Sequence, residues 1–592
     1  MRASAVVLAA VLSVAGVWAE DVPVVATQEG RVSGIKEEST KGKVFYSYYG
    51  IPFAKPPLGD LRLKDPVAAE PWEGVRDGST MPEMCLQVPF LDTLAGIRLP
   101  PEGLSGSEDC LYLNVFTPAV REEGLPVMVW IHGGGFFSGG ANEYLPHVLL
   151  NHDVVMVVLQ YRLGTLGFLS TEDSVIPGNF GLKDQTLALQ WVQRNIHNFG
   201  GDKTRVTIFG ESAGGASVHY QILSPKSDGL FARAIIQSGV AVDPWSQTRT
   251  WGEQAQYVAS ALTCPVQEGS EALLTCLQNV DGRKVAALAQ DFFRWFVLPM
   301  TVGPRVDGDF VPDEPGRLAR DHRHKKVDII IGYTADEGAM FTSSMMAQEE
   351  LVTAIETNFS AIAPITLQCD ADNADPPSVA RKIYNYYLGE GKLDPVAQKE
   401  QFTKMFSDRC EKVGSEFVAL YHAGDPASKN TYSYMLTHRG QLSHGDFAVE
   451  GGRHWVCHAD DLFYLFRGGP LLQPREQPPE RPQDLQRQED LKLRDIITTL
   501  WVNFASAGNP TPDDSLGFIW EPSTKDNLQY LDLKPRPTME PNQRQEVRRF
   551  HASLPTKVNF ALHPHLVQEE PAPAPDAGEP HRTWASTAHY EL

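Results

Sequence analysis

Apolar runs of strand length recur along the chain. Residues 127–131 and 154–159 are uninterrupted, and residues 205–209, 234–237 and 327–331 repeat the theme. Such runs suit strands that are covered on both faces, as in a parallel sheet. Between them, Leu182, Leu189, Val192 and Ile196 recur at near-helical spacing and predict a helix with one apolar stripe. Strands that alternate with helices predict a doubly wound α/β fold, with a mostly parallel sheet and helices on both faces.

The chain is long and acidic. Its 592 residues suggest roughly four domains at about 150 residues each, although large α/β folds often exceed that size as one domain. It carries 52 Lys and Arg against 74 Asp and Glu, a net charge of −22. Because nucleic-acid affinity rests on clustered basic residues, this balance argues against a nucleic-acid partner. The low-complexity segment 468–490 marks no boundary between folded domains.

Both ends of the chain carry targeting features. Residues 1–19 combine a charged start, a short apolar run and small residues before Glu20, which predicts a signal peptide. No later stretch is long and apolar enough for a transmembrane segment. Residues 564–592 form a Pro-rich tail, predicted to be flexible, that ends in His589-Tyr590-Glu591-Leu592 and resembles the KDEL/HDEL retention signals. We therefore expect the endoplasmic reticulum lumen, with secretion as the alternative, and a retention receptor as a partner.

A Gly-x-Ser-x-Gly motif gives the first chemical clue. Residues 209–215 follow a predicted strand and open a helix of small residues, with Ser212 at the centre of the motif. In a nucleophile elbow the glycines permit a tight turn that lifts the serine hydroxyl above the sheet. The strand before and the helix after Ser212 supply the context that the motif needs, so we interpret Ser212 as a nucleophile.

A glycine-rich loop supplies candidate oxyanion donors. Residues 132–136, His-Gly-Gly-Gly-Phe, end the strand at 127–131, and a loop of this kind accompanies the elbow. Backbone without side chains can bring the N–H groups of Gly134 and Gly135 to a developing oxyanion, and Ala213 adds a third donor. Each donor is worth about 3 kcal/mol of transition-state stabilisation. No Walker or Gly-x-Gly-x-x-Gly pattern supports a phosphate-binding loop.

A neutral serine needs a base, and the base needs an orienting carboxylate. Glu337 follows the predicted strand at 327–331, and Asp336 competes with it. Position alone does not separate the two acids. His458 lies downstream as the order Ser, acid, His requires. The same is true of His438, His444 and His454.

Metal and cofactor sites are not predicted. His454 and His458 have the i, i+4 spacing of a His-Glu-x-x-His motif, but Trp455 stands where the catalytic Glu belongs. The basic residues of segment 322–326 disfavour a metal ion at its two histidines.

Several longer motifs carry a resemblance to the type-B carboxylesterase/cholinesterase family, over about residues 24–562. The serine signature resembles residues 199–215, and the second signature resembles residues 107–115, Ser-Glu-Asp-Cys-Leu-Tyr-Leu-Asn-Val. Further similar segments are Gly-Ile-Pro-Phe-Ala at 50–54, Tyr-Arg-Leu-Gly at 161–164 and Trp-Val-Asn-Phe-Ala at 501–505. The resemblance implies one α/β-hydrolase domain over residues 20–563 and no cofactor.

The resemblance also implies roles for particular residues. The family's Asp-Glu-Gly motif matches Glu337 as the acid, and its His-x-[Asp/Glu]-[Asp/Glu]-Leu motif matches His458 as the base. Ser238, in Gln-Ser-Gly, resembles a hydroxyl that lies near the acid and the histidine. The family's disulfides map to Cys85–Cys110 and Cys264–Cys276.

An oxidising compartment allows cysteines to pair, and the chain has seven, so at least one is unpaired. Cys457, beside the expected base, is our first candidate for that thiol. The sequence also contains one N-glycosylation sequon, at Asn358.

The resemblance implies a serine carboxylic-ester hydrolase with a Ser-His-Glu triad, and the retention-like terminus favours broad specificity for small lipophilic esters. Phe90 is the single aromatic residue between Cys85 and Cys110, so the tryptophan face of choline-selective relatives is missing. A hormone-specific esterase of the juvenile-hormone or methyl farnesoate type, or a lipase-like esterase, is the alternative. Glu211 weakens the hormone alternative, because such esterases often carry Gln before the serine. A non-catalytic adhesion relative is less consistent with a complete triad.

Overall fold

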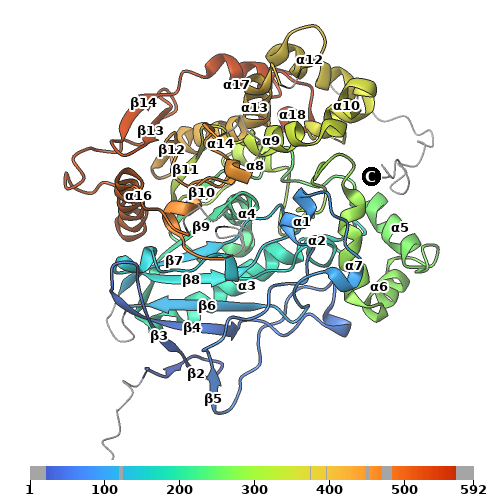
Figure 1. Cartoon of the computed structure of the whole chain (residues 1–592). Helices are drawn as coiled ribbons and strands as arrows, with labels where there is room; N and C mark the ends of the chain where they lie inside the picture. The colour runs from blue at the N-terminus through green and yellow to red at the C-terminus, as the bar shows by residue number, and fades with distance from the viewer. Residues whose placement is uncertain are drawn as a thin grey trace, which may run out of the picture.

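An eleven-stranded sheet organises the computed structural model, which describes residues 22–118, 124–371, 373, 375–394, 396–447, 453–469, 472 and 483–567. The order across the sheet is β14-β13-β12-β11-β10-β9-β7-β8-β6-β4-β3 (Figure 1). The strands are β3 (Ile35–Glu38), β4 (Val44–Pro52), β6 (Tyr112–Thr117), β7 (Leu125–Ile131), β8 (Val155–Leu159), β9 (Gly201–Glu211), β10 (Arg233–Gln237), β11 (Asp328–Thr334), β12 (Thr431–Leu436), β13 (Gln529–Leu533) and β14 (Thr538–Pro541). A second sheet joins β1 (Val25–Ala26), β2 (Arg31–Ser33) and β5 (Val75–Asp77).

The middle of the large sheet is parallel. Strands β8, β7, β9, β10, β11, β12 and β13 pair in parallel, whereas β14 and the β6, β4, β3 edge pair antiparallel. This confirms the predicted fold class, since the apolar runs at 127–131, 154–159, 205–209, 234–237 and 327–331 all lie in these parallel strands apart from single residues at two ends.

Helices cover both faces of the sheet (Figure 1). They are α1 (Phe90–Leu94), α2 (Gly164–Phe168), α3 (Phe180–Asn195), α4 (Ala213–Leu223), α5 (Trp251–Ala261), α6 (Ser270–Asn279), α7 (Gly282–Ala287), α8 (Pro315–Arg320), α9 (Ala339–Ala347), α10 (Glu349–Thr357), α11 (Phe359–Thr366), α12 (Pro376–Leu388), α13 (Lys399–Ser407), α14 (Val413–Gly424), α15 (Leu462–Leu465), α16 (Gln488–Ala507), α17 (Gln545–Ala552) and α18 (Lys557–Leu562). The helix predicted from Leu182 to Ile196 is α3, and Ile196 caps its end.

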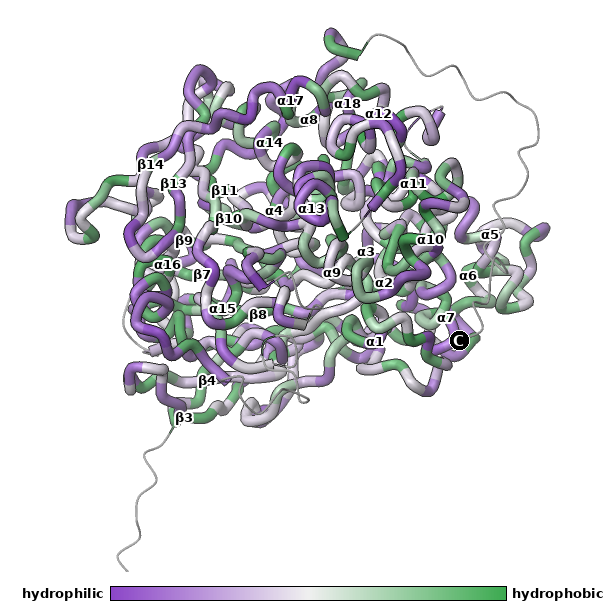
Figure 2. Tube along the Cα trace, turned by 45° about the horizontal axis from the view of Figure 1, so that its top comes forward, coloured by the Kyte–Doolittle hydropathy of each residue, from purple (hydrophilic) through white to green (hydrophobic). Residues whose placement is uncertain are grey.

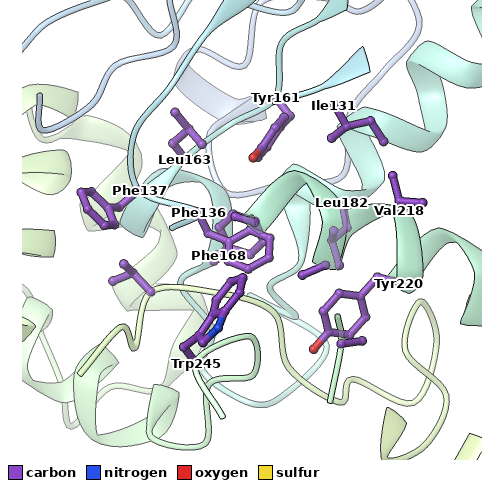
Figure 3. Packing of buried hydrophobic residues seen from close by; sticks show 14 of the residues in the cluster. Ile131, Phe136, Phe137, Tyr161, Leu163, Phe168, Leu182, Val218, Tyr220 and Trp245 are labelled. Carbon is purple, nitrogen blue, oxygen red and sulfur yellow. The ribbon is translucent and has the colours of Figure 1, made fainter. Parts of the chain in front are cut away.

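Strand β7 shows why the apolar runs are continuous. Val129 and Ile131 belong to the larger hydrophobic core, with α3 and α4, whereas Met128 and Trp130 belong to a second core with α16. Successive side chains of a strand point to opposite faces, so each face of β7 meets an apolar layer. Figure 3 shows part of the larger core, in which Ile131 of β7 lies near Val218 of α4. Hydrophilic residues predominate in outlying segments such as β14 and α17 (Figure 2).

Two disulfides join Cys85 to Cys110 and Cys264 to Cys276, the pairs that the family resemblance implied. Cys457 is buried and forms no disulfide in the described part of the chain. No helix among the described residues is long and apolar enough to cross a membrane. The signal peptide expected at residues 1–19 and the terminal tetrapeptide His589-Tyr590-Glu591-Leu592 lie outside the described residues, as does the tail beyond residue 567.

Candidate active site

Ser212 stands at the sharp junction between β9 and α4. Its backbone has φ 59° and ψ −123°, a combination that residues with a side chain seldom adopt. The Ser212 N–H donates to the carbonyl oxygen of Gln237 at 2.9 Å, which ties the turn to the end of the neighbouring strand β10. The strained turn therefore sits at the carboxyl edge of the parallel strands, where α/β sheets bind their ligands.

The two glycines of the motif allow α4 to approach the sheet closely. A Cβ atom on Gly214 would lie 2.1 Å from the carbonyl oxygen of Ile131, and one on Gly210 would lie 2.6 Å from the same oxygen. Real Cβ atoms do not come so close to backbone. Any larger residue at either position would push α4 away from β7, and the serine that precedes the helix would move with it.

Glu337 and His458 lie in contact at the same edge of the sheet. His458 Nδ1 is 2.6 Å from Glu337 Oε2, and both side chains are buried. The other Glu337 oxygen, Oε1, accepts hydrogen bonds from the Ser238 hydroxyl and from the Thr334 N–H, each at 2.6 Å. Ser238 thus lies where the family resemblance placed it, and the carboxylate is held from both sides.

The competing acid and histidines have other partners. Asp336 Oδ2 accepts from the Val456 N–H at 3.0 Å, and among the described residues Asp336 makes no hydrogen bond to His458. The nearest acid partners of the other histidines are Asp490 for His438 at 2.6 Å, Asp460 for His444 at 3.4 Å and Glu400 for His454 at 3.1 Å. Of these histidines only His444 lines the same cavity as Ser212 within the described residues.

The second ring nitrogen of His458 faces another carboxyl group. His458 Nε2 lies 3.0 Å from Glu211 Oε1, and no hydrogen bond joins Ser212 to His458 within the described residues. Catalytic hydrogen bonds are often loose before substrate binds. Glu211, which directly precedes Ser212, belongs to the site, although its place in the Gly-x-Ser-x-Gly motif did not indicate this contact with His458.

The charges around His458 are coupled. Burial disfavours its charged form, but the carboxylates of Glu211 and Glu337 outweigh burial and raise the pKa of His458 well above its usual value. Burial also opposes ionisation of Glu337, yet His458 and the hydrogen bonds at Oε1 lower the pKa of Glu337 below its usual value. For Glu211 burial prevails and raises the pKa to about 8.

The glycine loop lies beside the serine. Gly134 has φ 107°, and a Cβ atom there would lie 2.2 Å from the Ser138 carbonyl oxygen, so this position requires glycine. Gly134 and Gly135 line the cavity with Ser212, and their N–H groups have no acceptor within the described residues. Ala213 is the first residue of α4, where a backbone N–H has no partner in its own helix. All three donors are thus available to a ligand oxygen.

Gln87 fixes the far end of this loop. Its Oε1 accepts hydrogen bonds from the Ser138 hydroxyl at 2.8 Å and from the Gly139 N–H at 2.7 Å. Gln87 is buried between Cys85 and Cys110, so the disulfide loop supports the glycine loop. No motif marks Gln87, because the contact arises only when two segments some 50 residues apart come together.

These groups surround one cavity of about 770 Å³, within the range of small-molecule sites. Ser212 and His458 line it, and so do Glu211 and Cys457. Its walls also include Phe90, Phe137, Trp245, Val297, Met300, Met340 and Phe341. Figure 3 labels Phe137 and Trp245 among the buried residues of the larger hydrophobic core. The cavity suits a lipophilic ligand that presents one polar reacting group.

Two further sequence features have a place in the structure. Among the described residues no group of three or more His, Cys, Asp or Glu side chains is arranged to hold a metal ion. Asn358, in the glycosylation sequon, lies exposed between α10 and α11. Its glycosylation stays a prediction.

The parallel sheet and the serine on the turn between β9 and α4 are those of an α/β-hydrolase. The chain matches the model of the carboxylesterase family over residues 21–551. It therefore belongs to the carboxylesterase family and is a carboxylesterase, an enzyme that acts on ester substrates.

Curated relatives cover most of the chain. A juvenile hormone esterase of Tribolium castaneum is 35% identical over 84% of this chain and 85% of its own length. The pyrethroid hydrolase Ces2a of Mus musculus is 36% identical over 87% and 88%, and a cocaine esterase of Oryctolagus cuniculus is 37% identical over 87% and 93%.

The coupling at His458 predicts a change in pH dependence. We expect Glu211→Gln to lower the pKa of His458, because one of the two carboxylates that stabilise the imidazolium is lost. The acid limb of the kcat/KM profile for a neutral chromogenic ester then moves to lower pH. Glu356→Gln, the same change on the exposed face of α10, leaves the limb in place. An acid limb that stays in place or moves to higher pH in Glu211→Gln contradicts this account.

Proposed function

We propose that the chain hydrolyses carboxylic esters through a triad of Ser212, His458 and Glu337 and an acyl-enzyme intermediate. The observation that carries this proposal is the 2.6 Å contact between His458 and Glu337 at the wall of the cavity that Ser212 lines. A buried carboxylate in this position holds the imidazole in one tautomer and stabilises the imidazolium.

In the first half of the reaction His458 accepts the Ser212 proton while the serine oxygen attacks the ester carbonyl. Because Glu337 accepts the Nδ1 proton of His458, Nε2 is the nitrogen that receives the proton from serine. His458 then gives this proton to the departing alcohol. The elbow presents the Ser212 hydroxyl to the cavity throughout, since its turn is held by β10 and α4.

The developing oxyanion is held by the N–H groups of Gly134, Gly135 and Ala213. Among the described residues these donors have no competing acceptor to release, so their stabilisation of the transition state costs little reorganisation. In the second half, water takes the place of the alcohol. His458 removes a proton from the water, which attacks the acyl carbonyl. As the bond from the acyl carbon to the Ser212 oxygen breaks, His458 returns this proton to the Ser212 oxygen, and the acid is released.

We propose broad specificity for small lipophilic esters, which the size and apolar walls of the cavity support. A hormone-specific esterase is the second candidate, and it is favoured by the similarity to the juvenile hormone esterase of Tribolium castaneum. A lipase-like esterase would use the same machinery. A non-catalytic adhesion role is disfavoured, because the candidates for nucleophile, acid and base lie together at one edge of the sheet.

We place the enzyme in the endoplasmic reticulum lumen, with secretion as the alternative. The two disulfides support an oxidising compartment. The terminal His589-Tyr590-Glu591-Leu592 supports retention there through a receptor for such tetrapeptides.

Covalent labelling tests the nucleophile. An organophosphate should add one phosphoryl group to the intact protein at Ser212, as read by mass spectrometry of the peptides, and Ser212→Ala should take none. Ester hydrolysis by Ser212→Ala should fall by about 10⁴-fold or more, because the nucleophile and its base act as a unit. Glu337→Gln keeps the serine and should lose on the order of 10³–10⁴-fold in kcat. A phosphoryl group on another residue, or wild-type protein that takes none, contradicts the triad.

Hydrolysis of a substrate panel tests the specificity. Short-acyl, long-acyl and isoprenoid methyl esters should all be hydrolysed, with kcat/KM values within about two orders of magnitude, because an apolar pocket discriminates single methylenes by only about 10- to 200-fold. A kcat/KM confined to the isoprenoid methyl ester would instead identify the hormone-specific alternative.

Deletion of the last four residues tests retention. The full chain expressed in cultured animal cells should stay in the cell, whereas the chain that lacks residues 589–592 should accumulate in the medium as active esterase. Equal secretion of both chains contradicts the retention proposal and supports the secreted alternative.

A further inference from the structure

The wall of the active-site cavity contains a carboxyl group that the triad does not use. Glu411 lies in a π-helical turn, Asp408–Lys412, between α13 and α14, and such turns occur often at functional sites. It is 4% exposed and lines the same cavity as Ser212. Trp245, another wall residue, donates its indole N–H to the Cys410 carbonyl oxygen at 3.0 Å, which places an apolar ring beside this turn.

One oxygen of the Glu411 carboxyl group has no hydrogen-bond partner among the described residues, a feature that it shares with a few other buried acids of the described chain, Glu211 among them. In Glu411 this oxygen is Oε2, which is buried. By contrast, Asp184 is bound on both oxygens by Arg162, and Glu416 is bound by two arginines, an asparagine and a tyrosine. A buried polar atom without a partner costs about 1–3 kcal/mol. Because Glu411 lines the cavity and is slightly exposed there, a substrate group that enters the cavity can contact this carboxyl group.

The neighbouring groups keep this carboxyl group neutral. Burial raises the pKa of Glu411 well above its usual value, and the nearby acids Glu337, Asp243 and Glu211 raise it further, whereas His458 lowers it. The adjacent thiol of Cys410 is itself held protonated by burial. A neutral carboxyl group has one O–H to donate, and in an apolar site it acts as a hydrogen-bond donor to a ligand oxygen.

We propose that Glu411 is a specificity-determining residue: its neutral carboxyl group donates a hydrogen bond to a second oxygen of the substrate, an ether, epoxide or keto oxygen near the scissile ester. The pocket therefore favours oxygen-bearing esters over hydrocarbon esters of the same shape. This inference rests on the proposed function, since it assigns the substrate class of the same site. An ammonium group is the less suitable occupant, because it would require an ionised Glu411 among three other carboxyl groups.

Matched substrates test the inference in the full chain. A series of p-nitrophenyl esters carries one ether or keto oxygen at successive positions of the acyl chain, and a second series of acetate esters carries it in the alcohol. Each compound is compared with its CH₂ isostere. The quantity compared is the kcat/KM of the oxygen ester divided by that of its isostere. For at least one oxygen position this ratio should be about tenfold higher in the wild type than in Glu411→Leu, because the loss of one buried hydrogen-bond partner has about this effect.

Glu411→Gln is the conservative variant. Its amide keeps N–H donors, so the preference should be largely retained and should not change with pH. In the wild type the preference should fall at high pH, as Glu411 ionises and loses its donor. The other titrating groups near the site do not affect this measurement, because their ionisation changes kcat/KM for the oxygen ester and for its isostere alike and cancels in the ratio. These groups are His458, Glu211, Glu337, Asp243 and Cys410. The surface substitution Glu356→Leu is the matched control and should leave the ratio unchanged.

The outcomes separate the two proposals. Hydrolysis of the hydrocarbon isosteres by wild type tests the esterase function alone. If these are hydrolysed and no oxygen position gives a different ratio in wild type and Glu411→Leu, the inference about Glu411 is overturned while the triad stands. If Glu411→Leu does not fold, a wild-type ratio that stays flat with pH overturns it. A preference for an ammonium-bearing ester that Glu411→Gln abolishes also overturns it, because only an ionised carboxylate pairs with ammonium.

Discussion

The close approach of α4 to the ends of β7 and β9 is the constraint on which the site depends. Because residues 210 and 214 are glycines, no Cβ atom separates their backbone from the Ile131 carbonyl oxygen, and α4 can pack directly against the end of β7. That contact forces the turn at Ser212 into its strained conformation and leaves the first N–H of α4 beside the serine. The glycine loop that follows β7 then lies at the same point. The proposed nucleophile and oxyanion donors are thus positioned by one backbone contact and not by flexible side chains.

Around this rigid centre the chemistry is set by the way buried carboxyl groups are held. Glu337 is bound on both oxygens and its pKa is lowered, whereas burial raises the pKa of Glu211. Burial raises the pKa of Glu411 as well, and its Oε2 has no hydrogen-bond partner in the described part of the chain. In the proposed mechanism these three glutamates differ in role: Glu337 orients the base His458, Glu211 affects the pKa of His458, and Glu411 binds the substrate. Local hydrogen bonding, more than residue type, separates these roles.

The sequence predicts those parts of the structure that depend on neighbours in the chain. The apolar runs of the parallel strands and the glycines around Ser212 act locally, so their pattern is readable. The choice between Asp336 and Glu337 is different: both follow β11 directly, and the two side chains diverge because Val456 and His458 come from a segment about 120 residues further on. The family resemblance, and not the spacing, pointed to Glu337. Gln87 and Glu411 carry no pattern at all, since one acts across 51 residues on the glycine loop and the other is aimed by a π-helical turn.

The disulfide between Cys85 and Cys110 encloses Gln87, whose amide holds the loop that ends at Gly139. The position of the glycine loop thus depends on a covalent bond made after synthesis, while the elbow at Ser212 depends only on folding of the sheet. A newly made chain can therefore form the turn at Ser212 as soon as the sheet folds, whereas the glycine loop gains its full support only when Cys85 has paired with Cys110.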